Sequence, residues 1–269
     1  MKKIIFQHLA KTAGTSLIRS LQTCFPDQTC SARYDPELTP ELMTDSRFVF
    51  YHGHFSFDKV QEFKTVNPGA FAFVFLRHPV NRVLSQYYNW VDAERTREEY
   101  AAIKNRGGFP DAEINQKLDK FESTIFSMTL AQFLESKDTD IVDVVLNHQT
   151  RYMSLRSVYE ANPLLGCLNA VENITSFYDF VGLMETYSHS VERLRTVLGV
   201  EEGTLGEVRV NTNDNRKVSG HYRESREAIL QIVARNTFDL SIFHYALARA
   251  VAQIPGASIS DLLSLPEMT

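Results

Sequence analysis

The sequence lacks any long apolar segment. Its 269 residues contain no run that approaches the length of a membrane span, which needs about 20 apolar residues. Near the start, Lys2 and Lys3 are followed by only three apolar residues, Ile4 to Phe6, which is too few for the apolar region of a signal peptide. These absences predict a protein without a membrane span that works in the cytoplasm.

Cysteine is also scarce, and basic residues are outnumbered by acidic ones, 28 to 33. The formal net charge is -5 at pH 7, which disfavours a general nucleic-acid-binding surface. The chain has three cysteines, Cys24, Cys30 and Cys167, an odd number whose spacing matches no zinc motif and which a cytosolic protein keeps reduced. The sequence therefore predicts no nucleic-acid partner, no bound metal and no disulfide.

What the chain does contain is a strand, loop and helix at its start. Ile4 to Phe6 forms a short apolar run typical of a buried strand, and helical spacing begins at Leu17, Ile18 and Leu21. A loop that opens a helix offers free backbone N–H groups to an anion, a lysine adds positive charge, and a glycine allows close approach. We therefore predict a phosphate-binding loop made of Lys11, Thr12, Ala13, Gly14, Thr15 and Ser16.

This loop is not a Walker A motif. In that motif the lysine follows the second of two glycines, whereas Lys11 precedes Gly14, the only glycine of the loop. An ordinary capped turn between a strand and a helix therefore stays open as an alternative when this segment is considered alone.

A second segment points to the same chemistry. Phe71 to Leu76 is a continuous apolar run, as expected for a parallel strand that is buried on both faces. Arg77 follows at its carboxyl end, where open α/β sheets bind ligands. Pro79 suits the first turn of the next helix, and Ser85 lies two turns further along it. We predict that Arg77 and Ser85 bind the same anionic ligand.

A third segment carries two histidines. Phe48 to Tyr51 is predicted to be a strand that continues into His52, Gly53 and His54, and strand alternation places both imidazoles on one side. No carboxylate or cysteine nearby completes a metal-binding set. His54 suits a general base, because an unperturbed imidazole has a pKa of about 6.5. For His52, a catalytic role and a structural role in the core both remain open.

The three segments together resemble the sulfotransferases that use 3′-phosphoadenosine 5′-phosphosulfate (PAPS). The first segment is similar to the family pattern H-x-x-K-T-A-G-T-S, and the second to R-x-P-x-x-R-x-x-S. Tyr51 to Phe55 resembles the Y-H-G-H segment of the uronyl and heparan sulfate 2-O-sulfotransferases. The resemblance implies a sulfotransferase fold: an α/β three-layer sandwich with a mostly parallel sheet and a P-loop-like phosphosulfate-binding loop.

The resemblance also implies roles for single residues. Residues Lys11 to Ser16 would hold the 5′-phosphosulfate of PAPS, and Arg77 with Ser85 would hold its 3′-phosphate. Arg216 and Lys217 look like the late basic loop that closes over the same phosphate in this family. His54 would remove the acceptor proton, Lys11 would stabilise charge on the departing phosphate, and PAP would be the product. The acceptor is expected to be a small molecule or an oligosaccharide with a free hydroxyl group, such as a sugar, a lipid or another metabolite.

Two other functions remain open at this stage. A kinase-like phosphoryl transferase would need a lysine placed as in a P-loop and an aspartate for magnesium. A non-catalytic module that binds a nucleotide or a glycan would need no base at the position of His54. The oligomeric state is not predictable from the sequence.

The remaining segments are less informative. Residues 92–120 are charged and form either a solvated excursion or a mobile lid hinged at Gly107 and Gly108. In the segment that follows Asn147, Gln149 and Arg151 either face the cofactor or acceptor, or brace neighbouring loops. A long helix is expected over residues 224–251, broken near Thr237, followed by a loosely held tail at 255–269. The whole chain, 1–269, is predicted to be a single domain.

Overall fold

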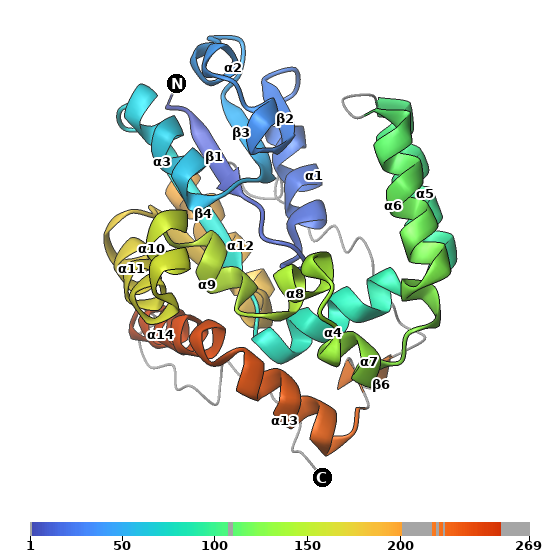
Figure 1. The fold of residues 1–269 in the computed structure, drawn as a ribbon. Coiled ribbons are helices and arrows are strands. Elements are labelled where there is room, and N and C mark those ends of the chain that lie inside the picture. Colours follow the sequence, from blue (N-terminus) through green and yellow to red (C-terminus); the bar gives the residue numbers. More distant parts are fainter. Residues whose placement is uncertain (1, 107–109, 201–216, 219–220, 223, 254–269) are drawn as a thin grey trace.

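The computed structural model describes residues 2–106, 110–200, 217–218, 221–222 and 224–253. Within them lies a five-stranded parallel sheet in the order β2-β3-β1-β4-β5 (Figure 1). Its strands are β1 (Ile4–Gln7), β2 (Thr29–Tyr34), β3 (Phe50–His54), β4 (Phe71–Leu76) and β5 (Phe180–Leu183). A separate antiparallel pair joins β6 (Lys217–Val218) to β7 (His221–Tyr222). The predicted α/β architecture with a mostly parallel sheet is confirmed.

Helices connect the strands and fill the rest of the described chain. Short 3₁₀ turns lie at Asp35–Glu37, Ile125–Ser127 and Met184–Thr186. The α-helices are α1 (Gly14–Cys24), α2 (Pro40–Thr44), α3 (Phe57–Val66), α4 (Pro79–Trp90), α5 (Ala93–Arg106), α6 (Asp111–Ser123), α7 (Leu130–Glu135), α8 (Thr139–Val145), α9 (His148–Tyr152), α10 (Arg156–Ala161), α11 (Pro163–Ser176), α12 (Tyr187–Leu198), α13 (Arg226–Arg235) and α14 (Thr237–Ala252).

Strand β4 shows why the sheet is buried on both faces. All six of its residues are buried, and its phenylalanines alternate with Ala72, Val74 and Leu76. The phenylalanines pack in one core together with α1 and α12, and the three residues between them pack in a second core with α3, α11 and α14. The sheet is therefore covered by helices on both sides, which accounts for its uninterrupted apolar sequence.

The connections open a crevice at the carboxyl edge of the sheet. Strands β1 and β3 are neighbours, yet the helices that follow them lie on opposite faces, α1 on one and α3 on the other. Ligands of open α/β sheets bind at such a switch point, because the two connections diverge there. A third apolar cluster, built from α4, α6, α7, α8 and α13, supports the segments beyond this edge.

Several element boundaries match the sequence predictions and others differ. The apolar runs at residues 71–76 and 180–183 both predict buried strands, which β4 and β5 confirm, and the predicted long helix is indeed broken, at Asn236 between α13 and α14. The polar, proline-bearing composition of residues 27–47 predicts a connection, which is wrong for residues 29–34, because strand β2 lies there. Residues 92–120 fold largely into α5 and α6, which run side by side (Figure 1). The proposed hinge at 107–108 and the tail at 255–269 lie outside the described residues.

Two further predictions concern the cysteines and the membrane. Cys24, Cys30 and Cys167 are all free thiols, as predicted. In the part of the chain that the structure describes, no helix combines the length and the hydropathy needed to cross a bilayer.

Candidate active site

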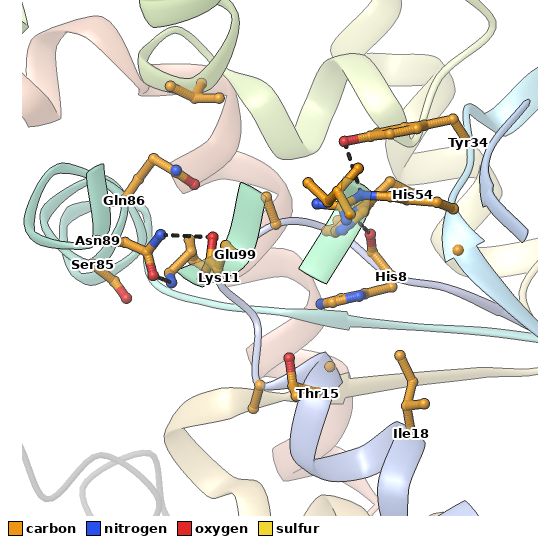
Figure 2. A pocket seen from close by; sticks show the side chains of 18 of the residues that line it. His8, Lys11, Thr15, Ile18, Tyr34, His54, Ser85, Gln86, Asn89 and Glu99 are labelled. Atoms are coloured by element: carbon orange, nitrogen blue, oxygen red, sulfur yellow. Dashed lines mark hydrogen bonds between the residues drawn. The ribbon is translucent and has the colours of Figure 1, made fainter. Parts of the chain in front are cut away.

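A cleft of about 1310 Å³ opens at the carboxyl edge of the sheet (Figure 2). On one side lie the residues of segment 8–19 that line the cleft, together with Arg77, and we call these the loop wall. On another side lie the lining residues of α5, α6 and α8, which we call the helical wall. The ends of β2 and β3, with His52 and His54, also line the cleft.

The loop after β1 is tightly turned. Lys11 and Ala13 both adopt left-handed backbone angles, with φ values of 68° and 63°. The loop starts from Gln7, whose fully buried side chain donates to the carbonyl groups of Phe55 and Tyr152 at 2.8 and 2.7 Å. Helix α1 then begins without a side-chain cap and without an acidic residue in its first turn, a helix start that favours an anion.

Gly14 allows the loop to close on His8. A Cβ atom at Gly14 would lie 2.0 Å from Cδ2 of the His8 ring, so no other residue fits here without moving that ring. The His8 ring is stacked between Phe6, with ring centroids 5.6 Å apart, and His54, at 4.4 Å. The predicted phosphate loop and the predicted base are therefore connected through the ring of His8.

His54 has a defined protonation state. Its Nδ1 lies 2.7 Å from the carbonyl oxygen of His8, and since a carbonyl only accepts, Nδ1 carries the proton and Nε2 carries the lone pair. Burial lowers the pKa of His54 to about 4, and the positive charges of Arg33 and Lys11 act in the same direction against the bond to His8. The imidazole is therefore neutral near pH 7 and able to accept a proton at Nε2.

His52 lies beside the base but is more enclosed. It is 7% exposed, lines the cleft, and packs against Phe50 with ring centroids 5.4 Å apart. Its proximity lowers the pKa of His8 further, although burial is the main cause of that shift. Both histidines of β3 thus reach the cleft, as the strand alternation predicts.

Lys11 is connected to the helical wall. Its Nζ donates to Oδ1 of Asn89 at 2.8 Å, and Nδ2 of Asn89 donates to Glu99 of α5 at 3.5 Å (Figure 2). Thr96 also donates to the main-chain oxygen of Asn89, at 3.1 Å. A single buried asparagine therefore links the charge of the loop wall to the first helix of the helical wall.

Arg77 extends from the end of β4 toward the loop. Its Nη1 donates to the carbonyl oxygen of Lys11 at 3.1 Å. The amide of Gln149 holds the main chain of Arg77 at both ends: it accepts from the N–H at 2.9 Å and donates to the carbonyl at 2.8 Å. Ser85 lines the cleft from α4, one helical turn before Asn89. Arg77 and Ser85 thus reach the cleft that the phosphate loop borders.

Gln149 and Arg151 lie outside the lining of the cleft. Gln149 is completely buried, and its own main-chain N–H donates to Asp239 of α14 at 3.1 Å. Arg151 forms an ion pair with Asp143 at 2.7 Å. Of the two roles expected for these residues, the contacts correspond to bracing: Gln149 positions Arg77, and Arg151 neutralises a carboxylate of the helical wall.

The other predicted site residues divide into three groups. Ala13, Gly14, Thr15 and Ser16 line the cleft, whereas Thr12 is 1% exposed and its hydroxyl donates inside the loop, to Leu9 at 2.9 Å. Lys217 lies in β6, but its side chain is not among those described. Arg216 lies outside the described residues.

Three further residues line the cleft without having been predicted from the sequence to have a role, namely His8, Tyr34 and Asn89. Asn89 follows Ser85 by four residues on α4, so helical spacing alone places it on the same face. His8 lies three residues before Lys11 and belongs to the quoted pattern, but nothing showed that it stacks on the base. Tyr34 lies at the end of β2, an edge strand whose sequence carries little apolar signal.

Comparison with known proteins identifies one family. A family model described as the sulfotransferase family matches residues 1–246. No curated protein matches the chain.

Proposed function

The chain belongs to the sulfotransferase family, and on that premise we propose that it moves a sulfuryl group from PAPS to a hydroxyl group of an acceptor. One observation carries the proposal: the neutral imidazole of His54 directs Nε2 away from the His8 carbonyl, beside a loop shaped for an anion. A binding module would gain nothing from a base that contacts the phosphate loop through a stacked ring.

His54 would act as the general base. Because Nδ1 is committed to the carbonyl of His8, Nε2 is the atom that takes the proton of the acceptor hydroxyl. His52 would line the same position as a second imidazole. Its burial and its contact with Phe50 suit a residue that shapes the site around His54.

The loop wall would hold the sulfuryl donor. PAPS supplies an activated sulfuryl group on a 5′-phosphate and carries a second phosphate at the 3′ position. The uncapped start of α1, the left-handed turn and the ammonium of Lys11 suit the first of these anions. In this role Lys11 and the N–H groups from Ala13 to Ser16 would stabilise negative charge that grows on the departing phosphate.

The 3′-phosphate would be bound from the other side of the loop. Arg77 presents a guanidinium whose backbone is held in place by Gln149, and Ser85 adds a hydroxyl from α4. A planar guanidinium binds phosphate with two parallel hydrogen bonds, which suits this role. Arg216 and Lys217 complete the proposed clamp.

Calorimetric titration with PAP, the desulfonated product, tests the proposal. The protein is expected to bind PAP with a micromolar Kd and to bind ATP with magnesium at least about tenfold more weakly, because only PAP carries the 3′-phosphate. Arg77→Ala removes the guanidinium but leaves the two main-chain bonds to Gln149, so it is expected to abolish measurable PAP binding.

Arg156→Ala provides the matched control. Arg156 is an exposed arginine paired with Glu160 and lies outside the cleft, so its removal is expected to leave the Kd for PAP unchanged. Equal binding of ATP and PAP, or no binding of PAP, would contradict a PAPS-dependent reaction and favour a phosphoryl transferase.

A further inference from the structure

We propose that Tyr34 is the surface on which the acceptor ring rests, and that the acceptor is an uncharged, ring-bearing alcohol such as a neutral sugar. The inference rests on the proposed function, because it assigns the acceptor side of the same cleft. Three features carry it: a bulge that brings Tyr34 to the base, the exposure of the Tyr34 ring, and the charge of the helical wall.

The bulge lies in β2. The ladder between β2 and β3 shifts register after Ser31, and Tyr34 then pairs with His54. Gly53 makes this possible, because a Cβ atom at that position would lie 1.8 Å from the carbonyl oxygen of Ala32. Bulges next to active sites redirect a side chain. Here the redirected side chain is that of Tyr34, which lies beside His54, its partner in the ladder.

The ring of Tyr34 is exposed but held in place. The residue is 39% exposed, and its ring centroid lies 5.9 Å from that of His54, with the two planes inclined by 31°. The Arg33 guanidinium lies 5.5 Å from the ring centroid, and its Nε donates to the hydroxyl of Tyr34 at 3.2 Å. Figure 2 shows Tyr34 extending over His54. A flat apolar surface fixed beside the base orients a ring-shaped substrate.

The helical wall disfavours an anionic acceptor. Its basic cleft residues are Arg95, already paired with Glu99 at 3.4 Å, and Lys117. Its acidic cleft residues are more numerous: Glu98, Glu99, Glu113, Asp140 and Asp143. Two of these carboxylates are balanced by cations outside the cleft lining, since Asp140 pairs with Lys120 and Asp143 with Arg151, both at 2.7 Å. The acidic character of the wall therefore rests mainly on Glu98 and Glu113. A glycan rich in carboxylates or sulfates would meet like charge along this wall, whereas an uncharged acceptor would not.

Two glycosides that differ at one carbon test the charge of the acceptor. p-Nitrophenyl β-D-glucoside and p-nitrophenyl β-D-glucuronide are identical except for a hydroxymethyl group or a carboxylate at C5 of the ring. With PAPS as donor, we expect kcat/KM for the glucoside to exceed that for the glucuronide by about tenfold or more. Titration of both into the protein saturated with PAP gives the matching Kd values. Equal rates, a preference for the glucuronide, or no binding of the glucoside would overturn the inference.

Tyr34→Ala tests the platform. Loss of the ring is expected to raise KM for the glucoside about tenfold while the Kd for PAP stays within about twofold, and Tyr34→Phe is expected to restore most of the affinity, because it keeps the ring. Tyr245→Ala, on α14 and outside the cleft, controls for loss of a tyrosine elsewhere. An unchanged KM in Tyr34→Ala, or an equal rise in Tyr34→Phe, would show that the ring does not bind the acceptor.

Titration of the unmodified protein with PAP separates the two proposals. If PAP does not bind, the proposed function fails, and with it the basis of this inference. If PAP binds but the glucuronide is preferred, the sulfotransferase proposal stands and only the assignment of the acceptor is overturned.

Discussion

The loop wall and the helical wall of the cleft are built in opposite ways. In the loop wall, Lys11 and Arg77 are held by hydrogen bonds, and Gly14 is packed against His8. In the helical wall, most of the side chains of α5 and α6 are exposed, and Ile114 and Phe121 are the buried residues of α6. The loop wall is held by hydrogen bonds and close packing. The helical wall presents mostly exposed side chains, which can be substituted without disturbing the core.

The charges of the two walls differ in the same way. The loop wall carries basic side chains and, among the described residues that line it, no carboxylate. The helical wall carries both signs with acidic residues in excess. We infer that the loop wall, which we assign to the donor, tolerates few substitutions. In the helical wall, which we assign to the acceptor, substitution of exposed residues can change acceptor specificity.

The largest effect is expected at His54, whose ring stacks on His8 of the loop wall. In His54→Asn, the asparagine Nδ2 can still donate to the carbonyl of His8, but no group accepts the proton of the acceptor. We expect kcat to fall about 10²- to 10⁴-fold, as for loss of a general base, with little change in the Kd for PAP. Single-turnover rates with PAPS measure the first quantity and calorimetry the second. A kcat within about threefold of the unmodified protein would remove His54 from the mechanism.

The pH dependence sharpens this assignment. Because burial lowers the pKa of His54 from 6.5 to about 4, the imidazole stays neutral through the neutral range, so kcat/KM is expected to remain flat to about pH 5.5 and to fall below it. The unfolded chain binds this proton near pH 6.5 and the folded chain does so only near pH 4. The contribution of the neutral His54 to folding stability is therefore fully present above pH 6.5, and it is lost as the pH falls from 6.5 toward 4. An acid limb centred near pH 6.5 would contradict a buried base.

An intermediate effect is expected at Asn89, the residue that joins the two walls. Asn89→Asp places a carboxylate against the ammonium of Lys11, so we expect PAP binding to weaken about tenfold. Asn89→Leu removes the acceptor of that hydrogen bond together with the Nδ2 donor to Glu99, and it is expected to lower kcat by several fold with a smaller change in the Kd. Glu99→Gln serves as the control. Glu99 contacts Asn89 and not Lys11, so this variant is expected to change the Kd for PAP least of the three. Tighter PAP binding in Asn89→Asp would show that Asn89 does not hold Lys11 next to the donor.

The smallest effect is expected on the helical wall. Glu98→Gln is expected to reduce the preference for the neutral glycoside about twofold at low salt, and less at high salt, because exposed charges are screened. Glu94→Gln, on the same helix but outside the cleft, is the matched control. A larger effect of Glu94→Gln than of Glu98→Gln would mean that the long-range charge of the protein, and not this wall, selects the acceptor.

The sequence predicts the centre of the fold better than its edges, for a physical reason. Central parallel strands such as β4 are apolar on both faces, so their composition alone reveals them. Strand β2 lies at the edge of the sheet, contains a bulge, and buries only the small residues Cys30 and Ala32, so its alternation gives little apolar signal. The break at Asn236 was visible because the helical pattern changes near Thr237.

The residues of the candidate site also divide into those that the sequence predicts and those that it does not. The residues of the loop wall were predictable because an anion loop needs particular residue types at fixed spacings. Tyr34 was not, since its position depends on the register of an edge strand. Gln149 was assigned two possible roles because a short polar motif does not show which partner it faces. The partner that the structure shows is Arg77, which lies 72 residues away in the chain.

The contact of Gln149 with Arg77 also sets an order of events during synthesis. Gln149 holds the main chain of Arg77, and the N–H groups of Gln149 and Thr150 are held in turn by Asp239 of α14. A nascent chain that has emerged from the ribosome only as far as α12 contains every loop-wall residue but lacks the carboxylate that completes this brace. The brace behind Arg77 is therefore complete only after α14 has been made, so the loop wall lacks this support until that helix is in place.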